Sequence, residues 1–420
     1  LAVVMVFMIV MYAVPGVAAS LALAIYTTLV IATLYLFEIT LTLPGIAGII
    51  LGIGMAVDAN VIVFARIREE IATGKSVQTS MKIGFQKAMS AILDGNITTL
   101  IAAVVLMALG SGTVKGFAYT LMIGIILSLF TAMVVTRYIL YSLYALGLKS
   151  EKLYGRAKER KSINFIGKRA VFFTVSGVII AAGLISMGVH SATEGKALNY
   201  GLDFMGGTST TADFGKDMSI EDIESSIVPY VEKVTGDSDV QATKVEGTTQ
   251  VTIKTRTLNL DERQALEDTL VDDCGVDAAT ITSQSISSTI SGEMRSDALK
   301  AVVVACIFML LYIWFRFKDI RFAASAILAL VHDVLVVITV YALVRISVGS
   351  TFIACVLTIV GYSINDTIVI FDRIRENLAL KTGKQTAEDL KEIANKSLTQ
   401  TLSRSINTSI TTFIMVVMLY

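Results

Sequence analysis

The feature that most constrains this chain is a carboxylate inside a membrane-length apolar stretch. The sequence is almost wholly apolar from Leu41 to Phe64, long enough to cross a bilayer as a helix, yet it contains Asp58. Asp58 follows Pro44 by about fourteen residues, or about 21 Å of helix, which is a depth inside the hydrocarbon. An ionised aspartate there costs at least about 2.5 kcal/mol, so Asp58 must face protein or water.

This stretch occurs twice in the sequence. Residues 361–376 match residues 54–69 at the glycine, the phenylalanine, both arginines and the glutamate. Asn365 aligns with Asp58, and Asp366 takes the neighbouring position. Shorter matches pair 18–20 with 323–325 and 73–75 with 382–384. Both halves are expected to enter the membrane in the same direction, which predicts a parallel internal repeat.

Composition and charge predict a polytopic α-helical membrane protein. Hydrophobic residues make up 54% of the chain, and the mean hydropathy is +0.70. The segments between alternate spans are basic and are expected to face the cytoplasm, at 66–87, 149–169, 316–321 and 373–404. Ten spans are predicted, near 1–13, 17–37, 44–66, 94–110, 116–137, 169–189, 297–315, 322–344, 350–372 and 401–420.

The long hydrophilic segment 190–295 is predicted to be extracytoplasmic. It holds 19 acidic and 8 basic residues, which argues against nucleic-acid binding. Its pattern predicts a small α+β domain of order β, α, β, β, α, β, as in a ferredoxin-like sandwich. Strands are expected at 198–204, 208–214, 240–245, 249–256 and 278–287, and helices at 220–233 and 261–271.

The polar residues inside the spans are candidates for an ion relay. Arg404 begins a helix whose polar stripe continues through Asn407, Thr408 and Thr411, while Gly95 replaces the arginine in the first half. A carboxylate that is neutral when protonated and needs a cation or water when ionised can bias helix packing. We predict a proton or cation relay of Asp58, Asp366 and Arg404, with Asp94, His332, Asp333, Asn60 and Asn365 as secondary candidates. The alternative is that these groups only fix helix register through hydrogen bonds.

Two signature segments and one loop carry a resemblance to a known family. Residues 54–69 and 365–377 resemble the signature transmembrane helices of SecD and SecF in the SecD/SecF protein-export family, fused in one chain as in SecDF, within the resistance-nodulation-division (RND) superfamily. The loop after the span 169–189 is similar to the GxDFxGGT motif of SecF. Its matching residues are Gly201, Asp203, Phe204, Gly206 and Gly207.

The resemblance implies a division of the chain into five parts. These are a SecD-like transmembrane half at 1–146, a basic linker at 147–168, a first SecF-like helix at 169–189, the extracytoplasmic domain at 190–295 and a SecF-like transmembrane half at 296–420. The linker charges Lys149, Lys152, Arg156, Lys158, Arg160 and Lys161 suit either a segment on anionic lipid or an ordinary cytoplasmic loop. A first helix, a large first extracytoplasmic domain and a last helix are expected beyond the two ends.

The implied function is export of unfolded proteins driven by an ion gradient. The resemblance implies that Asp58, Asp366 and Arg404 take part in ion passage, with H⁺ or Na⁺ as the coupling ion. The implied location is the cytoplasmic (inner) membrane. The implied partners are the Sec translocation channel, its accessory membrane proteins, unfolded preprotein and the lipid bilayer.

No enzymatic activity, cofactor or metal is expected. The segment Ala72–Ser76 lacks the first glycine of a P-loop, and three residues separate Asp58 from the Gly-x-Gly sequence that would precede it directly in an intramembrane aspartyl protease. Two alternatives remain open: an RND exporter of small molecules or lipids, and a passive scaffold that links the channel to a membrane insertase.

Overall fold

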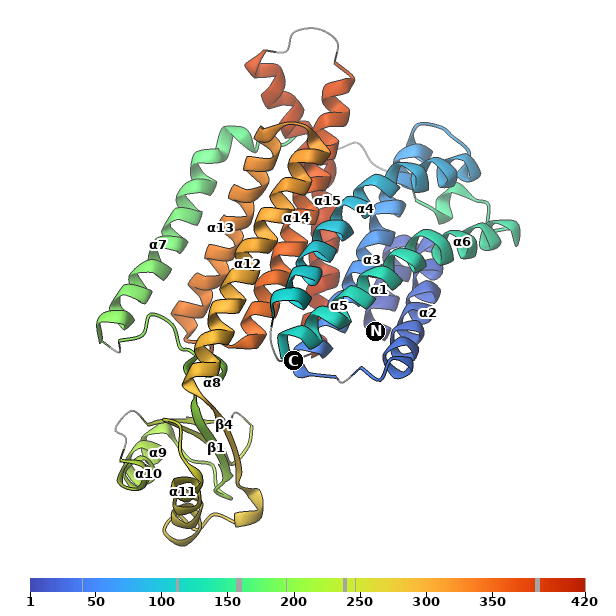
Figure 1. The fold of residues 1–420 in the computed structure, drawn as a ribbon. Helices are drawn as coiled ribbons and strands as arrows, with labels where there is room; N and C mark the ends of the chain where they lie inside the picture. The colour runs from blue at the N-terminus through green and yellow to red at the C-terminus, as the bar shows by residue number, and fades with distance from the viewer. Residues whose placement is uncertain are drawn as a thin grey trace. The chain divides into compact units, whose positions relative to one another are not determined.

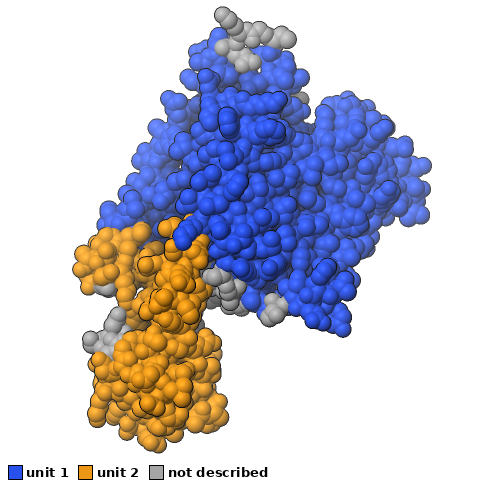
Figure 2. Space-filling model, viewed as in Figure 1, with its two compact units in different colours: residues 1–186, 300–343, 353–420 blue, residues 187–299, 344–352 orange. Residues whose placement is uncertain are grey.

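The computed structural model describes residues 1–39, 41–110, 113–155, 161–193, 195–236, 240–245, 247–381 and 386–419. The chain divides into two compact units (Figure 2). Unit 1 contains Leu1–Ser186, Lys300–Leu343 and Ile353–Tyr420, and unit 2 contains Met187–Leu299 and Val344–Phe352. The linker residues Arg156, Lys158 and Arg160 and the repeated triplet 382–384 lie outside the described residues.

Unit 1 is built from long helices (Figure 1). In the described ranges, eight helices are long and apolar enough to cross a membrane: Val14–Leu36, Pro44–Ala72, Val77–Leu109, Val114–Ala145, Ile166–Thr193, Ser288–Phe317, Ile320–Val344 and Phe352–Ala379. Ala2–Tyr12 is apolar but shorter, and the predicted span 401–420 falls in the second half of α15.

The bounds of the helices outside the sheet domain are as follows: α1 Ala2–Tyr12, α2 Val14–Leu36, α3 Leu43–Ala72, α4 Val77–Leu109, α5 Thr113–Phe130, the π-helical turn η1 Thr131–Val135, α6 Thr136–Ala145, the short helices η2 Glu151–Leu153 and η3 Ile166–Lys168, α7 Arg169–Thr193, α12 Ser288–Phe317, α13 Ile320–Val344, α14 Ser350–Ala379 and α15 Ala387–Leu419.

Several predicted spans are shorter than the helices that contain them, because hydropathy detects the apolar part of a helix and not its polar continuation. The predicted span 94–110 begins at Val77 in the structure, and the span 401–420 begins at Ala387. Ser76 explains the first difference, since its side chain accepts a hydrogen bond from the Thr79 amide and caps α4.

α3 is the central helix of the first half, where it packs against α2, α4 and α5 and also against α15. Small residues permit this close packing. A Cβ on Gly52 would lie 3.2 Å from Gly124 Cα, so α3 and α5 approach each other almost backbone to backbone.

Corresponding residues of the two halves make the same contacts. A phenylalanine of each signature helix packs on an aromatic ring from the helix that opens its half, and an arginine one turn later lies over that same ring. The ring centroids are 5.5 Å apart for Tyr12–Phe64 and 6.0 Å for Phe317–Phe371, and the guanidinium lies 4.5 Å from the centroid for Arg68–Tyr12 and 5.2 Å for Arg375–Phe317.

Unit 2 contains a four-stranded antiparallel sheet of order β2-β3-β1-β4 (Figure 1). Buried apolar residues of β1, β3 and the helices form its core, among them Ala212, Ile223, Val231, Ile253, Leu266 and Leu270. The elements are α8 Leu202–Met205, β1 Gly207–Asp213, α9 Ile220–Ser226, α10 Val228–Thr235, β2 Gln241–Lys244, β3 Gln250–Thr255, α11 Leu260–Asp272, η4 Ala278–Thr280 and β4 Thr282–Ile286.

Three predictions for this unit were wrong in detail. The predicted strand 278–287 begins with the short helix Ala278–Thr280, and its strand is Thr282–Ile286. The stretch 198–204 is not a strand: Tyr200 forms a single bridge with Val348, and Leu202–Met205 is a helical turn. The predicted helix 220–233 is two helices separated at Ile227, because Pro229 in the first turn of α10 has no N–H to donate to the carbonyl of Ser225 and so cannot continue α9.

We predict that the charge of Glu262 stabilises the start of α11. Hydrogen bonds from Arg256 and from the Asn259 amide lower the pKa of Glu262 to about 2, below the usual 4.5. This stabilisation is fully present above pH about 4.5 and is lost as the pH falls toward 2. Glu262→Gln should therefore speed hydrogen exchange of the α11 amides at neutral pH, measured by mass spectrometry against wild type at the same pH, and this difference should disappear near pH 2.

The matched control for this prediction is Glu267→Gln on the same helix. Glu267 forms no side-chain hydrogen bond with other residues in the described ranges, so its variant should exchange like wild type at every pH. Equal exchange in Glu262→Gln and wild type at neutral pH would contradict the assignment.

Candidate functional site

Asp58, Asp366 and Arg404 lie close together in unit 1. Asp58 on α3 is only 3% exposed, and the charges that act on it are Asp366 on α14 and Arg404 on α15. Thr411, one of the polar residues predicted to follow Arg404, also lies beside the Asp58 carboxyl. The structure therefore brings the three predicted relay residues into one group, and their role in ion passage stays a prediction.

Arg404 is the cation of this group. Arg404 interacts electrostatically with Asp366 and Asp58, and its buried Nε has no hydrogen-bond partner in the described part of the chain. Asp58 Oδ1 is also buried without such a partner. Charges in a low-dielectric interior interact strongly even when they are not in contact, so a small movement of α15 would change the environment of both acids.

The positions that the repeat relates to Asp58 and Arg404 carry no charge. Asn365 occupies the position that corresponds to Asp58, and Gly95 occupies the one that corresponds to Arg404. The two meet in the structure: a Cβ on Gly95 would overlap the Asn365 side chain at Oδ1. The Asn365 amide packed on Gly95 therefore takes the place of the Asp58 and Arg404 pair. The charge of the site is asymmetric as a result.

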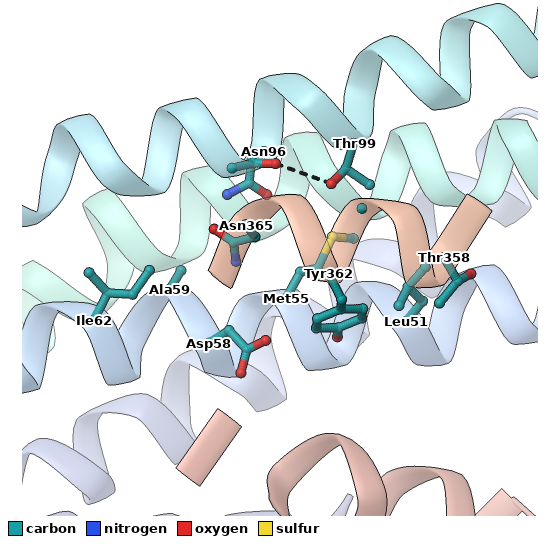
Figure 3. Close-up of a pocket in the computed structure, with 12 residues that line it drawn as sticks. Leu51, Met55, Asp58, Ala59, Ile62, Asn96, Thr99, Thr358, Tyr362 and Asn365 are labelled. Carbon is teal, nitrogen blue, oxygen red and sulfur yellow. Dashed lines mark hydrogen bonds between the residues drawn. The ribbon is translucent and has the colours of Figure 1, made fainter. Parts of the chain in front are cut away.

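A small cavity opens beside Asp58 between α3, α4 and α14 (Figure 3). Its volume is about 20 Å³ measured with a water-sized sphere. The polar residues that line it are Asp58, Asn96, Thr99, Thr358, Tyr362 and Asn365. A single water needs roughly 10–15 Å³ by this measure, so the cavity can admit one small polar guest.

Asn60 does not line this cavity. It lies two residues after Asp58, about 200° around the helix, and is 4% exposed. Its Nδ2 donates to the Ala56 carbonyl at 2.9 Å. Of the secondary candidates on α3 and α14, the structure places Asn365 in the site and Asn60 outside it.

Asp94 is held by a fixed cation that the sequence analysis missed. Arg316 of α12 donates from Nε to both Asp94 oxygens, at 2.9 and 2.8 Å, and the Tyr312 hydroxyl donates to Oδ1 at 2.7 Å. Asp94 is 5% exposed, and the next carboxylate, Asp372, lies 4.0 Å from Arg316. The Asp94–Arg316 pair therefore connects α4 of the first half to α12 of the second. The sequence feature that could have identified this partner is Arg316, which directly follows the predicted span 297–315.

His332 and Asp333 form a bridge between three helices. His332 Nδ1 lies 2.8 Å from Asp333 Oδ1, and His332 Nε2 lies 2.9 Å from Ser176 Oγ of α7. Ser363 of α14 donates to Asp333 Oδ2 at 2.7 Å. Asp333 also acts electrostatically on Asp366, so the bridge reaches the edge of the charge group. This geometry is compatible with both predicted roles of His332 and Asp333, a part in an ion relay and a hydrogen bond that only joins helices.

Four residues of the two signature helices form a reciprocal ion-pair ring. Each arginine pairs with the glutamate three residues later and with the glutamate of the other half. The distances are 2.9 Å for Arg66–Glu69, 3.1 Å for Arg66–Glu376, 2.8 Å for Arg373–Glu376 and 3.3 Å for Arg373–Glu69. The repeat identified these residues in the sequence, but it did not reveal that they pair across the two halves.

The glycine-rich loop of unit 2 has a geometric explanation. Gly206 and Gly207 have φ values of 74° and 120°, which only glycine adopts readily, and they lead directly into β1. The Gly201 amide donates to the Val348 carbonyl at 2.9 Å, and Phe204 is buried. Asp203 lies against Gly349, where a Cβ would be 3.2 Å from its Oδ2. These contacts describe a structural turn.

The described residues contain no group of three or more histidine, cysteine, aspartate or glutamate side chains placed to hold a metal ion. The three cysteines, Cys274, Cys306 and Cys355, are free.

Comparisons with known proteins point to one family. A family model described as "Protein export membrane protein SecD/SecF, C-terminal" matches residues 1–145 and 267–420. The chain is 35% identical over its whole length to "Protein translocase subunit SecDF" of Bacillus subtilis and 34% identical over 99% of its length to that of Brucella abortus. It covers 58% and 53% of these two relatives, so it spans about half the length of the curated proteins it matches.

Solved structures agree with this result. The crystal structure of SecDF from Thermus thermophilus, described as a translocon-associated membrane protein, superposes with a TM-score of 0.86 at 34% identity. The match covers 99% of this chain and 55% of that one. A crystal structure of SecDF in a super-membrane-facing form superposes with a TM-score of 0.72 at 32% identity, again over 99% and 55% of the two chains.

We predict that the Asp94–Arg316 pair stabilises the packing of the two halves. In a double-mutant cycle, Asp94→Asn and Arg316→Gln should each lower the thermal stability of the purified protein, because Asp94→Asn leaves the partly buried Arg316 without its main partner and Arg316→Gln leaves the buried Asp94 without its cation. The double variant should lose less than the sum, with a coupling energy of about 1–3 kcal/mol. Additive losses would contradict this assignment. Lys381→Gln is the control and should not couple to Asp94→Asn, because Lys381 pairs with Asp389, outside this charge network.

Proposed function

The chain belongs to the SecD/SecF family of protein-export membrane proteins, and from this premise we propose that it is an ion-gradient-driven accessory subunit of the Sec protein translocase. It promotes late stages of preprotein export across the cytoplasmic (inner) membrane. Its partners are the Sec translocation channel, the accessory membrane proteins of that channel, the unfolded preprotein and the lipid bilayer.

One observation carries the ion-coupling part of this proposal: Asp58, Asp366 and Arg404 share one buried charge group. A protonated carboxyl tolerates a dry interior, whereas the ionised form needs the guanidinium or water. Loading an ion from one side and releasing it to the other therefore changes which packing of α3, α14 and α15 is favoured. One charge that crosses 100 mV supplies about 2.3 kcal/mol, which is enough to bias a two-state rearrangement.

The proposed architecture is of the RND type. The matched contacts of the two halves support a parallel repeat related by an axis along the membrane normal. The strand order of unit 2 supports a ferredoxin-like sandwich for segment 190–295, which is extracytoplasmic in this proposal. The basic segments between alternate spans then face the cytoplasm.

The coupling ion is H⁺ in this proposal, with Na⁺ as the alternative, and neither an enzymatic activity nor a cofactor is required. A passive scaffold is the competing function. The ion-pair ring of Arg66, Glu69, Arg373 and Glu376 favours it to the extent that it ties the two halves together. The two functions differ in whether an uncoupler changes the rate of export.

We predict that Asp366→Asn and Arg404→Ala abolish the effect of the gradient on export. Either change removes one side of the charge group, so ion loading no longer alters helix packing. Preprotein export into membrane vesicles should fall to the rate that wild type shows with an uncoupler, at constant ATP, while membrane insertion of the variants stays normal.

The matched control is Asp372→Asn, which removes another partly buried carboxylate from the same helix α14 and faces Arg316 instead. This variant should keep its response to the gradient. If Asp366→Asn and Arg404→Ala export at the wild-type rate, the ion-coupling assignment of these residues is overturned. If wild type is insensitive to the uncoupler, the protein is a scaffold.

A further inference from the structure

The continuous helix formed by α5, η1 and α6 is longer than the hydrocarbon of a bilayer. Val114–Ala145 has 32 residues, or about 48 Å of helix, whereas about 20 residues cross the roughly 30 Å of hydrocarbon. A helix that enters at Val114 therefore leaves the hydrocarbon close to η1, Thr131–Val135. The last part, α6, lies beyond that depth, among the lipid headgroups or on the membrane surface.

Buried hydroxyl groups stabilise a bend between α5 and α6. Thr136 Oγ1 donates to the Thr131 carbonyl of the π-helical turn at 3.1 Å. Thr131 Oγ1 in turn donates to the Leu127 and Ser128 carbonyls, at 2.9 and 3.1 Å. π-turns and hydroxyls bonded to backbone carbonyls both bend helices, and α6 turns away from the direction of α5 (Figure 1). α6 can therefore run along the membrane surface while α5 crosses the membrane.

α6 packs one face on the protein and carries tyrosines outside that face. Thr136 and Leu140 are buried, and α6 packs on α2. Tyr141 and Tyr144 are three residues apart and are therefore neighbours on the helix surface, while Tyr138 is 70% exposed. Tyrosine is enriched where a helix meets the membrane interface, because its ring is apolar and its hydroxyl is polar. These residues indicate an interfacial helix.

A cation lies over each of the two neighbouring tyrosine rings. The guanidinium carbon of Arg137 is 5.8 Å from the centroid of Tyr141, and Lys149 Nζ is 5.7 Å from the centroid of Tyr144. The same guanidinium carbon is 5.9 Å from the centroid of Phe85 on α4. Neither cation forms an ion pair or a side-chain hydrogen bond with another residue in the described ranges. The two charges are therefore held in place without being neutralised.

The start of the linker fixes the position of Lys149. The Tyr154 side chain is buried in the core of the first half, and its hydroxyl donates to the Leu148 carbonyl at 2.8 Å. The Lys149 amide donates to the Gly147 carbonyl at 2.9 Å, which closes a tight turn directly after α6. Lys149 therefore stays beside the tyrosines of α6.

The charge and the exposed apolar residues of this region match an anionic phospholipid. Residues 131–155 contain three basic residues, Arg137, Lys149 and Lys152, and one acidic residue, Glu151. The basic groups attract a phosphate. Val134 at the bend and Leu146 after α6 are exposed, and they offer an apolar surface to the acyl chains of the same lipid. A soluble anion matches the charge but not this apolar surface.

We propose that α6 lies in the membrane interface and that Arg137 and Lys149 bind the headgroup of an anionic phospholipid there. Tyr141 and Tyr144 orient the two cations. In the proposed orientation this lipid belongs to the cytoplasmic leaflet. Because α5 packs on α3, the bound lipid holds the cytoplasmic end of that helix pair at a fixed depth. The proposal needs only that the chain spans a membrane, and it is independent of the ion-driven function.

The test identifies the lipid beside α6 by fluorescence quenching. Tyr141→Trp places a fluorescent ring at the site and keeps the cation contact, and Trp314→Phe removes the single native tryptophan. The full chain is placed in phosphatidylcholine nanodiscs that contain either brominated phosphatidylglycerol or brominated phosphatidylcholine at the same fraction. Phosphatidylglycerol should quench more strongly. Arg137→Gln and Lys149→Gln should each lower its relative binding constant about fivefold, and the double variant should show no preference.

Three controls accompany these variants. Lys115→Gln removes an exposed cation at the other end of the same helix and should leave the quenching unchanged. Arg137→Lys keeps the charge and should keep the preference for phosphatidylglycerol. Soluble glycerol phosphate should not compete, because it lacks the acyl chains.

The dependence on salt tests the proposal without any change of charge. The preference for phosphatidylglycerol should fall as the ionic strength rises, because salt screens exposed charges. Equal quenching by the two lipids at low salt would overturn the proposal and would mean that neutral lipid or another protein covers α6. A preference that survives the loss of both cations, quenching by neither lipid, or competition by glycerol phosphate would overturn it as well.

Discussion

The arrangement of the transmembrane unit follows from the cost of placing Asp58 in hydrocarbon. An ionised carboxylate at that depth cannot face lipid, so α3 must be enclosed by other helices, and Asp58 is 3% exposed as a result. The helices that enclose it come from both halves: α2, α4 and α5 from the first, and α15 from the second. The association of the two halves is therefore coupled to the charge state of this one side chain.

The repeat supplies a symmetric frame around an asymmetric centre. The ion-pair ring and the two stacks of arginine on an aromatic ring occur at equivalent positions in both halves. The centre differs, because Asn365 and Gly95 stand where the other side has Asp58 and Arg404. The buried centre therefore has one charged side and one neutral side.

The sequence predicted the parts of this structure that depend on local pattern, and missed those that depend on which helices meet. The signature repeat identified Asp58 and Asp366, the polar stripe of the last helix identified Arg404, and the structure brings the three together. Hydropathy could not show that α4 starts at Val77, since the added turns are amphipathic. The partner of Asp94 was missed because Arg316 lies more than two hundred residues away in the chain. Such a pair depends on how two helices are aligned along each other. The periodicity of a single sequence does not contain this information for helices that are far apart in the chain.

Two other charge groups in the described part of the membrane unit are balanced. In the ion-pair ring two arginines meet two glutamates, and Arg316 is shared by Asp94 and Asp372 while Arg375 stands beside Asp372. These groups are close to neutral and need no ion. Asp58 and Asp366 have only Arg404 between them, so their neutral state requires one further positive charge. Because a dry interior penalises net charge, we expect the charge state of this group and the packing of α15 against α3 to depend on each other.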